Sequence, residues 1–121
     1  MVVGAMKRLA VTGSRVWRHD LWWMIWHELH DADHLILGDC PTGADLWARR
    51  FAEFYQRSHR VHYADWDAHG PSAGPLRNSQ MALDNPTHAV AFAAFGHSNN
   101  GTRDCYRKLR GVDIVPKVVR A

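Results

Sequence analysis

Short apolar runs alternate along the chain with longer segments in which apolar residues recur at helical spacing. Apolar runs that are not interrupted by alternating polar residues are typical of strands in a parallel sheet covered on both faces. The expected strands are Lys7–Thr12, His34–Leu37, Arg60–Tyr63, His88–Phe92 and Asp113–Val118. The expected helices cover about Arg18–Asp31, Thr42–Gln56, a stretch from Pro75 that ends before Asn85-Pro86, and Thr102–Arg110, which Gly111 would close; Ala64–Pro71 is expected to be a loop. The pattern predicts an α/β fold: a single compact Rossmann-like domain over residues 1–121, with a parallel sheet of about five strands and helices on both faces.

Four glycine-bearing segments each follow an apolar run and open a helical one. In an open α/β sheet such turns lie along one edge, where helix N-termini offer backbone N–H groups and a partial positive charge. The sequence therefore predicts one crevice at the C-terminal edge of the sheet, suited to an anionic, nucleotide-like ligand. The candidate ligand-binding residues are Gly13, Ser14, Arg15, Gly38, Thr42, Gly43, Asp45, Gly74, Arg77, Asn78, Gly101 and Thr102.

The first and last of these segments are candidate phosphate sites. The backbone N–H groups of Gly13 and Ser14 and the Ser14 hydroxyl would contact a phosphate, with Arg15 as the counter-charge, because a guanidinium matches phosphate oxygens. The alternative is a tight turn after the strand, for which glycine is suited. Gly101 and the Thr102 hydroxyl would form a second phosphate cradle at the start of the last helix.

Thr42 and Asp45 have the spacing of a capping box, which would explain both residues locally. Gly38 and Gly43 flank the pair and would also let a ligand approach the backbone, in which case Asp45 could accept a ribose or base hydroxyl. Both interpretations remain open from the sequence.

Arg77 lies in the first turn of its helix, where a cation opposes the helix dipole unless an anion is nearby. The anion could be a ligand phosphate, or it could be a carboxylate such as Asp65 or Asp67. Asn78 follows Arg77 and would face the same crevice.

Composition narrows the class of protein. A net charge of +3, with 46% apolar and 22% charged residues, fits a globular protein that binds a phosphate-bearing ligand. No apolar run approaches the roughly 20 residues of a membrane helix, and no signal-peptide pattern opens the chain.

Cys40 and Cys105 are two cysteines without a disulfide framework, so we expect reduced thiols and a cytoplasmic location, with Cys105 a packing residue. The nine histidines lack a metal-ligand signature, although His69 and His97 lie near the crevice; no metal and no cofactor are expected.

The first helical segment is unusually rich in tryptophan: Trp17, Trp22, Trp23 and Trp26. Leu21, Met24, Ile25 and Leu29, with Trp17, form the arc expected to pack on the sheet. The other tryptophans extend the apolar surface round most of the helix, which predicts burial on a second side. We expect a homo-oligomer whose interface uses Trp22 and Trp26; stacking on single-stranded bases is the alternative.

The motifs, in this order, resemble the SLOG superfamily, which includes the Lonely-Guy phosphoribohydrolases and DNA-processing proteins of the DprA type. They are Val11–Arg15, Gly38–Asp45, Ala73–Asn78 with Met81, and Gly101-Thr102. The chain is most similar to the small YspA-related branch of bacteria and phages. The resemblance runs from about Lys7 to Val115 and implies that the crevice binds a nucleotide or a nucleotide-derived molecule.

The Lonely-Guy branch cleaves the N-glycosidic bond of nucleoside 5′-monophosphates with an Arg-Lys-x-x-Met helix and a Gly-Gly-x-Gly-Thr-x-x-Glu turn. Here Asn78 replaces the lysine, and Cys105 stands where that turn has its glutamate. Asp104 precedes it by one residue, which on a helix is a rotation of about 100°. The resemblance makes Arg77 and Asp104 the candidate catalytic residues.

Three functions are therefore considered. The first hypothesis is that the protein senses or sequesters a nucleotide. The alternative is N-glycosidic hydrolysis of a nucleoside monophosphate or an NAD-like compound, and the third is DprA-like nucleic-acid binding.

Overall fold

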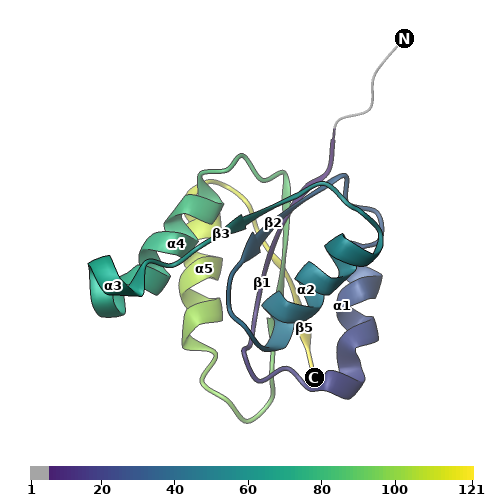
Figure 1. Cartoon of the computed structure of the whole chain (residues 1–121), viewed down its shortest axis with the longest axis horizontal. Helices are drawn as coiled ribbons and strands as arrows, with labels where there is room; N and C mark the ends of the chain where they lie inside the picture. Colours follow the sequence, from purple (N-terminus) through teal and green to yellow (C-terminus); the bar gives the residue numbers. More distant parts are fainter. Residues whose placement is uncertain (1–5) are drawn as a thin grey trace.

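The protein contains a five-stranded, all-parallel sheet with the strand order β3-β2-β1-β4-β5 (Figure 1). The computed structural model describes residues 6–121. The strands are β1 (Arg8–Gly13), β2 (His34–Gly38), β3 (His59–His62), β4 (His88–Ala93) and β5 (Lys117–Arg120). The helices are η1 (His19–Leu21), α1 (Trp22–Leu29), α2 (Gly43–Phe54), α3 (Trp66–His69), η2 (Gly70–Ser72), α4 (Ala73–Ala82) and α5 (Asn100–Gly111). The predicted Rossmann-like α/β fold is confirmed.

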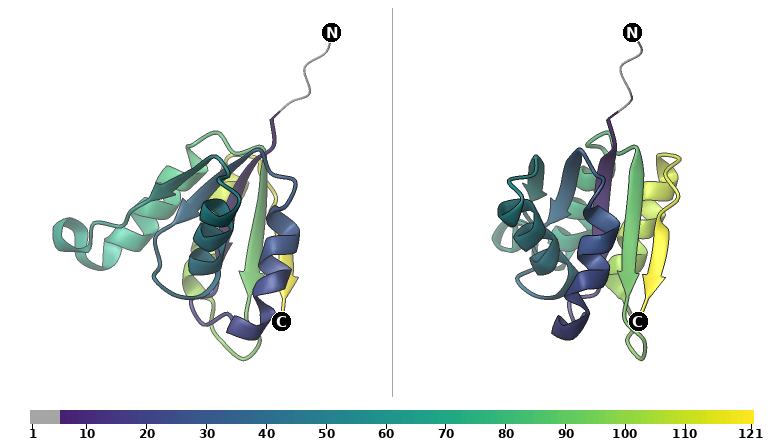
Figure 2. Two further views of the ribbon diagram at one scale, coloured as in Figure 1. Left: turned by 45° about the vertical axis from the view of Figure 1, so that its right-hand side comes forward. Right: turned by 90° about the vertical axis from the view of Figure 1, so that its right-hand side faces the viewer.

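Helices cover both faces of the sheet, α1 and α2 on one and α4 and α5 on the other (Figures 1 and 2). Successive strand residues point to opposite faces. Leu9 and Val11 of β1 therefore pack in the cluster under α1 and α2, whereas Ala10 packs with Cys105 and Leu109 of α5. This two-sided burial explains why the central strands are apolar throughout, and it confirms Cys105 as a packing residue. Within the described residues, no helix has the length and apolar character needed to cross a membrane.

The first helix is shorter than the predicted Arg18–Asp31. Arg18 has extended backbone angles, and a 3₁₀ turn precedes α1. Trp17 was expected on this helix but lies before it, where its ring packs edge-on against Phe92 at 5.4 Å between centroids. The Trp17 Nε1–H donates to the Leu21 carbonyl at 3.1 Å. Trp17 thus joins the core from the connecting turn.

Three further predictions about elements were wrong. The expected loop Ala64–Pro71 contains α3 and most of η2, because the Asp65 carboxylate caps α3 by accepting from the Ala68 N–H at 3.1 Å. The last strand begins at Lys117 rather than Asp113, which has a left-handed φ of 64°. Gly111 is the last residue of α5 and does not adopt the left-handed conformation of a terminating glycine.

The first turn of α2 packs directly against the turn that follows β1. The Ala44 N–H donates to the Ser14 carbonyl at 3.0 Å, and the Thr42 hydroxyl donates to the Arg15 carbonyl at 2.8 Å. Thr42 makes no side-chain cap to α2, so of the two interpretations left open by the sequence the capping box is wrong: the threonine binds a different segment of the chain. Gly43 has a φ of +68°, and a Cβ there would lie 2.2 Å from the Ser14 carbonyl oxygen.

Replacing Gly43 with alanine should therefore destabilise the fold by about 2–4 kcal/mol, since it adds both left-handed strain and a backbone clash. Gly111→Ala is the matched control, because a Cβ at Gly111 meets nothing within 4 Å and lies in a helix. The control should be neutral or slightly stabilising. Urea denaturation measures both; equal stability of the two variants would contradict the packing described here.

Exposed aromatic side chains lie on α1 and at the end of α2: Trp22, Trp23, Phe54 and Tyr55. Trp26 is half-buried against α2, with its ring 5.6 Å from that of Phe51 and its Nε1–H bonded to the Trp47 carbonyl. Part of the cover predicted for α1 thus comes from α2 of the same chain. Trp22 and Trp23 remain 39% and 54% exposed, and self-association through this surface stays a prediction.

Self-association is best tested with Trp22→Glu and Trp23→Glu combined. A variant at Trp26 would also disturb the packing of α1 on α2, so a change in mass could not be assigned to the interface alone. We expect the wild type to sediment as an oligomer and the double variant to sediment at the monomer mass of 13.8 kDa. Circular dichroism checks that the variant remains folded. A wild type that sediments as a monomer at micromolar concentration would refute the interface.

Candidate functional site

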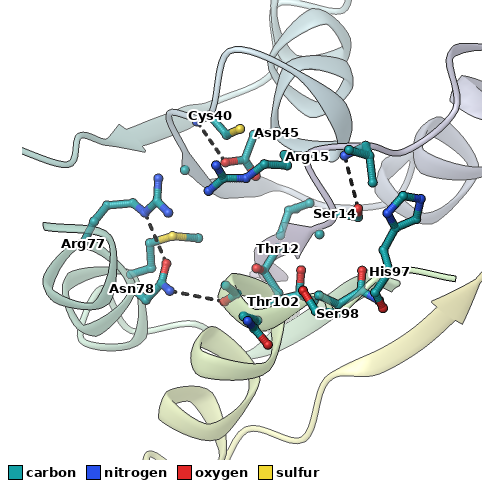
Figure 3. Close-up of a pocket in the computed structure, with 18 residues that line it drawn as sticks. Thr12, Ser14, Arg15, Cys40, Asp45, Arg77, Asn78, His97, Ser98 and Thr102 are labelled. Carbon is teal, nitrogen blue, oxygen red and sulfur yellow. Dashed lines mark hydrogen bonds between the residues drawn. The ribbon is translucent and has the colours of Figure 1, made fainter. Parts of the chain in front are cut away.

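A cavity of about 380 Å³ opens at the C-terminal ends of β1 and β2, beside the turn that follows β4 (Figure 3). The chain passes from β1 to β2 on one side of β1, and after β3 it crosses over to β4 on the other side of β1. The cavity therefore lies at the topological switch point of the sheet, where the direction of the connections reverses. The cavity is lined by Val11, Thr12, Gly13, Ser14, Arg15, Val16, Gly38, Cys40, Asp45, Arg77, Asn78, Met81, His97, Ser98, Asn99, Asn100, Gly101 and Thr102.

Most of the predicted ligand-binding residues meet at this cavity: Gly13, Ser14, Arg15, Gly38, Asp45, Arg77, Asn78, Gly101 and Thr102. Thr42 and Gly43 do not line it. They contact the backbone of the turn that contains Arg15, through the Thr42 hydroxyl and through close packing at Gly43. Gly74 lies outside the cavity, where it leaves room for the Trp66 ring. His69 belongs to α3 and is not a lining residue, whereas His97 is.

Arg77 is paired with a carboxylate that the sequence reasoning missed. Its Nη1 lies 2.6 Å from Oδ1 of Asp39, and both side chains are mostly buried. The expected partners, Asp65 and Asp67, form no ion pair with it in the described chain. Asp39 directly follows β2 at the C-terminal edge of the sheet, and this position was the signal in the sequence that could have identified it as the partner of Arg77. The pairing reduces the capacity of Arg77 to bind a second anion.

Asp45 is a buried carboxylate in the wall of the cavity, 7% exposed. Its Oδ2 accepts from the Cys40 N–H at 3.1 Å, and a Cβ at Gly38 would lie 2.6 Å from the same oxygen. Gly38 therefore makes room for the carboxylate rather than for a ligand. Burial raises the pKa of Asp45 to about 6, against the nearby positive charge of Arg77 and the Cys40 hydrogen bond, which favour the ionised form.

Asn78 connects this side of the cavity to Asp104. The Asn78 Oδ1 accepts from Arg77 Nε at 3.2 Å, and its Nδ2 donates to Asp104 Oδ2 at 3.0 Å. Asp104 also pairs with Lys108 at 2.9 Å and does not line the cavity. Partial burial would raise the pKa of Asp104, but the bonds from Lys108 and Asn78 lower it overall. Asp104 thus orients Asn78 and is not directed at a bound ligand.

The N-terminus of α5 forms the opposite wall. Asn99 precedes it with a left-handed φ of 54° and makes no side-chain cap, because its amide is bonded to the Ala94 N–H and carbonyl. The first N–H groups of α5 are therefore without a capping side chain at the cavity. A Cβ at Gly101 would meet nothing within 4 Å, so Gly101 leaves open space above this terminus.

The turn after β1 supplies a hydroxyl and a cation. The Ser14 N–H, which was expected to bind phosphate, donates instead to the Phe92 carbonyl at 2.8 Å and is unavailable. The Ser14 hydroxyl accepts from the Val16 N–H at 3.2 Å and keeps its own proton to donate (Figure 3). The exposed Arg15 makes no ion pair within residues 6–121.

Of the two cysteines, Cys40 lines the cavity, whereas Cys105 is buried in the core and does not. Burial raises the pKa of Cys105 to about 11, so its thiol is protonated at neutral pH. Among the described residues, no group of three or more histidines, cysteines or carboxylates is placed to hold a metal ion. Thr12 and Ser98 line the cavity and were missed by the sequence reasoning, as polar residues at the end of a strand and in a turn.

Fold and cavity together define a Rossmann-like α/β protein with its candidate site at the switch point. The chain is 36% identical over 118 residues to the Gene 61 protein of Mycobacterium phage D29, covering 90% of this chain and 93% of the phage protein. The chain belongs to the family of this phage protein. No family model and no solved structure matches it.

Because the pKa of Asp45 is raised in the folded state, we expect the free energy of unfolding to depend on pH. Between about pH 4 and pH 6 the folded state holds a proton that the unfolded state releases, so this group's contribution to stability falls as the pH rises through 6. Asp45→Asn removes the cost of burying the ionised carboxylate. The free energy of unfolding of the variant minus that of the wild type should therefore be about 1–3 kcal/mol larger at pH 8 than at pH 4. Urea denaturation of wild type and variant at both pH values gives the difference; a difference independent of pH would contradict the assignment.

Proposed function

We propose that the cavity binds a nucleotide or a nucleotide-derived ligand, with a phosphate at the N-terminus of α5. The observation that carries the proposal is the uncapped start of a twelve-residue helix at the switch-point cavity, with Gly101 leaving open space above it. Backbone N–H groups and the helix dipole favour an anion there. Arg15 and the Ser14 hydroxyl lie on the same cavity and add a cation and a donor.

The opposite wall suits the uncharged part of the ligand. Arg77 lies between Asp39, its ion-pair partner, and Asp45, so its charge is already compensated. Carboxylate and amide groups of this kind recognise hydroxyl and amino donors of a ribose or base. A volume of about 380 Å³ falls within the range of small-molecule sites.

The resemblance to the SLOG superfamily supports the same proposal, and we propose the phage Gene 61 family as a YspA-related branch of it. The supporting residues are the strand-end turns at Gly13–Arg15 and Gly101-Thr102, which lie on one cavity. The proposed biological role is sensing or sequestering the nucleotide.

Thermal denaturation with AMP and with adenosine tests the proposal. AMP at about 100 times its dissociation constant should stabilise the protein by about 2.7 kcal/mol, and adenosine should do less because it lacks the phosphate. Gly101→Val should abolish the AMP effect, because it adds bulk at the start of α5, where a Cβ meets nothing within 4 Å in the fold. Gly111→Val, at the other end of α5, is the matched control and should bind AMP as the wild type does. No shift with any nucleoside phosphate, or a shift that survives Gly101→Val, would refute the proposed site.

N-glycosidic hydrolysis is the second candidate, favoured by the buried Asp45 carboxylate in the wall. In this reaction water adds to C1′ of the ribose and the C1′–N bond breaks. The adenine of AMP leaves with the proton from the water, whereas the nicotinamide of NAD leaves as a neutral base and that proton goes to solvent. A carboxylate stabilises the positive charge that develops on the sugar. Incubation with AMP and NAD followed by chromatography separates the candidates: free base, lost in Asp45→Asn, would indicate the hydrolase, and a thermal shift without base release would indicate binding alone.

A further inference from the structure

A second groove of about 500 Å³ lies between α5 and the edge strand β5. Its floor is made of small apolar side chains on one face of the sheet, Ala91 and Ala93 of β4 and Val118 of β5. Within the described chain no helix packs closely on β5, and Val118 is 40% exposed. The proposed function does not use this groove.

The walls of the groove carry Arg103 and Arg107 from α5 and Arg120 from β5, with Tyr106 beside them. No carboxylate lines it, and none of the three exposed arginines forms an ion pair within residues 6–121. Other basic residues of this chain do pair, such as Arg77 with Asp39 and Lys108 with Asp104. Three guanidinium groups without an ion-pair partner lie around one hollow and, although Arg107 also lies near Asp104, together they attract an anion.

The groove adjoins the cavity of the proposed nucleotide site. Asn99 and Thr102 line both, so the two hollows lie on either side of the first turn of α5. Asn99 and Thr102 thus form surface that is common to both hollows. A ligand anchored at the α5 N-terminus can therefore continue past Asn99 and Thr102 into the groove.

We propose that the ligand is a phosphate-linked dinucleotide, with its first nucleotide in the cavity and its second in the α5–β5 groove. This inference rests on the proposed function and names its substrate class. The arginines would contact the linking or distal phosphate, since guanidinium groups match phosphate oxygens. Tyr106 and the apolar floor offer a surface on which the second base can stack.

Calorimetric titration with AMP, 5′-phosphorylated diadenylate and NAD, at one fixed salt concentration, tests the inference. We expect a dinucleotide to bind at least about tenfold more tightly than AMP. Arg107→Gln with Arg120→Gln should remove that gain and leave the affinity for AMP unchanged. Arg18→Gln with Arg110→Gln makes the same change in net charge outside both hollows and should keep the gain. The tighter of the two dinucleotides identifies a phosphodiester or a pyrophosphate linkage.

Two results would overturn the inference while nucleotide binding stands: dinucleotides that bind no more tightly than AMP, or a gain that survives Arg107→Gln with Arg120→Gln. If neither AMP nor a dinucleotide binds the folded wild type, the proposed function fails and this inference fails with it. Circular dichroism of each double variant confirms that a lost gain is not caused by unfolding.

Discussion

The candidate site depends on the close packing of two backbone turns, the one after β1 and the one that begins α2. A Cβ at Gly13 would lie 2.5 Å from that of Ala44, and a Cβ at Gly43 would overlap the backbone of Ser14 and Arg15. A side chain at either glycine would separate the turns. Because they touch, Arg15 from one turn and Asp45 from the other share a cavity although they are far apart in the chain.

The cavity has two walls of different electrostatic character. On one side Arg77 is compensated by Asp39 and lies near the buried Asp45, so the positive charge there is balanced. On the other side the uncapped N–H groups of α5 and the exposed Arg15 have no such compensation in the described chain. An anion gains more by approaching α5, because a phosphate beside Arg77 would compete with a carboxylate already at 2.6 Å. The orientation proposed for a nucleotide follows from this difference.

The fold was predictable because its signals are local and repeated: strands apolar on both faces, each followed by a glycine-bearing turn. The meeting of those turns followed from the general geometry of parallel sheets. The individual contacts were not predictable. Thr42 and Asp45 have the spacing of a capping box, yet each bonds elsewhere, to the Arg15 carbonyl and to the Cys40 N–H. Sequence spacing is the same for a local cap and for a tertiary bond. The partner of Arg77 was likewise decided by how α4 docks on β2, which no local pattern encodes.

Helix α5 shows what the proposed resemblance to the Lonely-Guy pattern would imply for the chemistry available to the cavity. Cys105, at the position of that pattern's glutamate, is fully buried in the core under the sheet, where an ionised carboxylate would be costly. Asp104 is rotated about 100° from it and bonds to Asn78 and Lys108 between α4 and α5. In this chain neither Cys105 nor Asp104 lines the cavity, so neither presents a carboxylate there. Catalysis at a glycosidic bond in this cavity would therefore have to use Asp45, which approaches from α2, the element on the opposite face of the sheet.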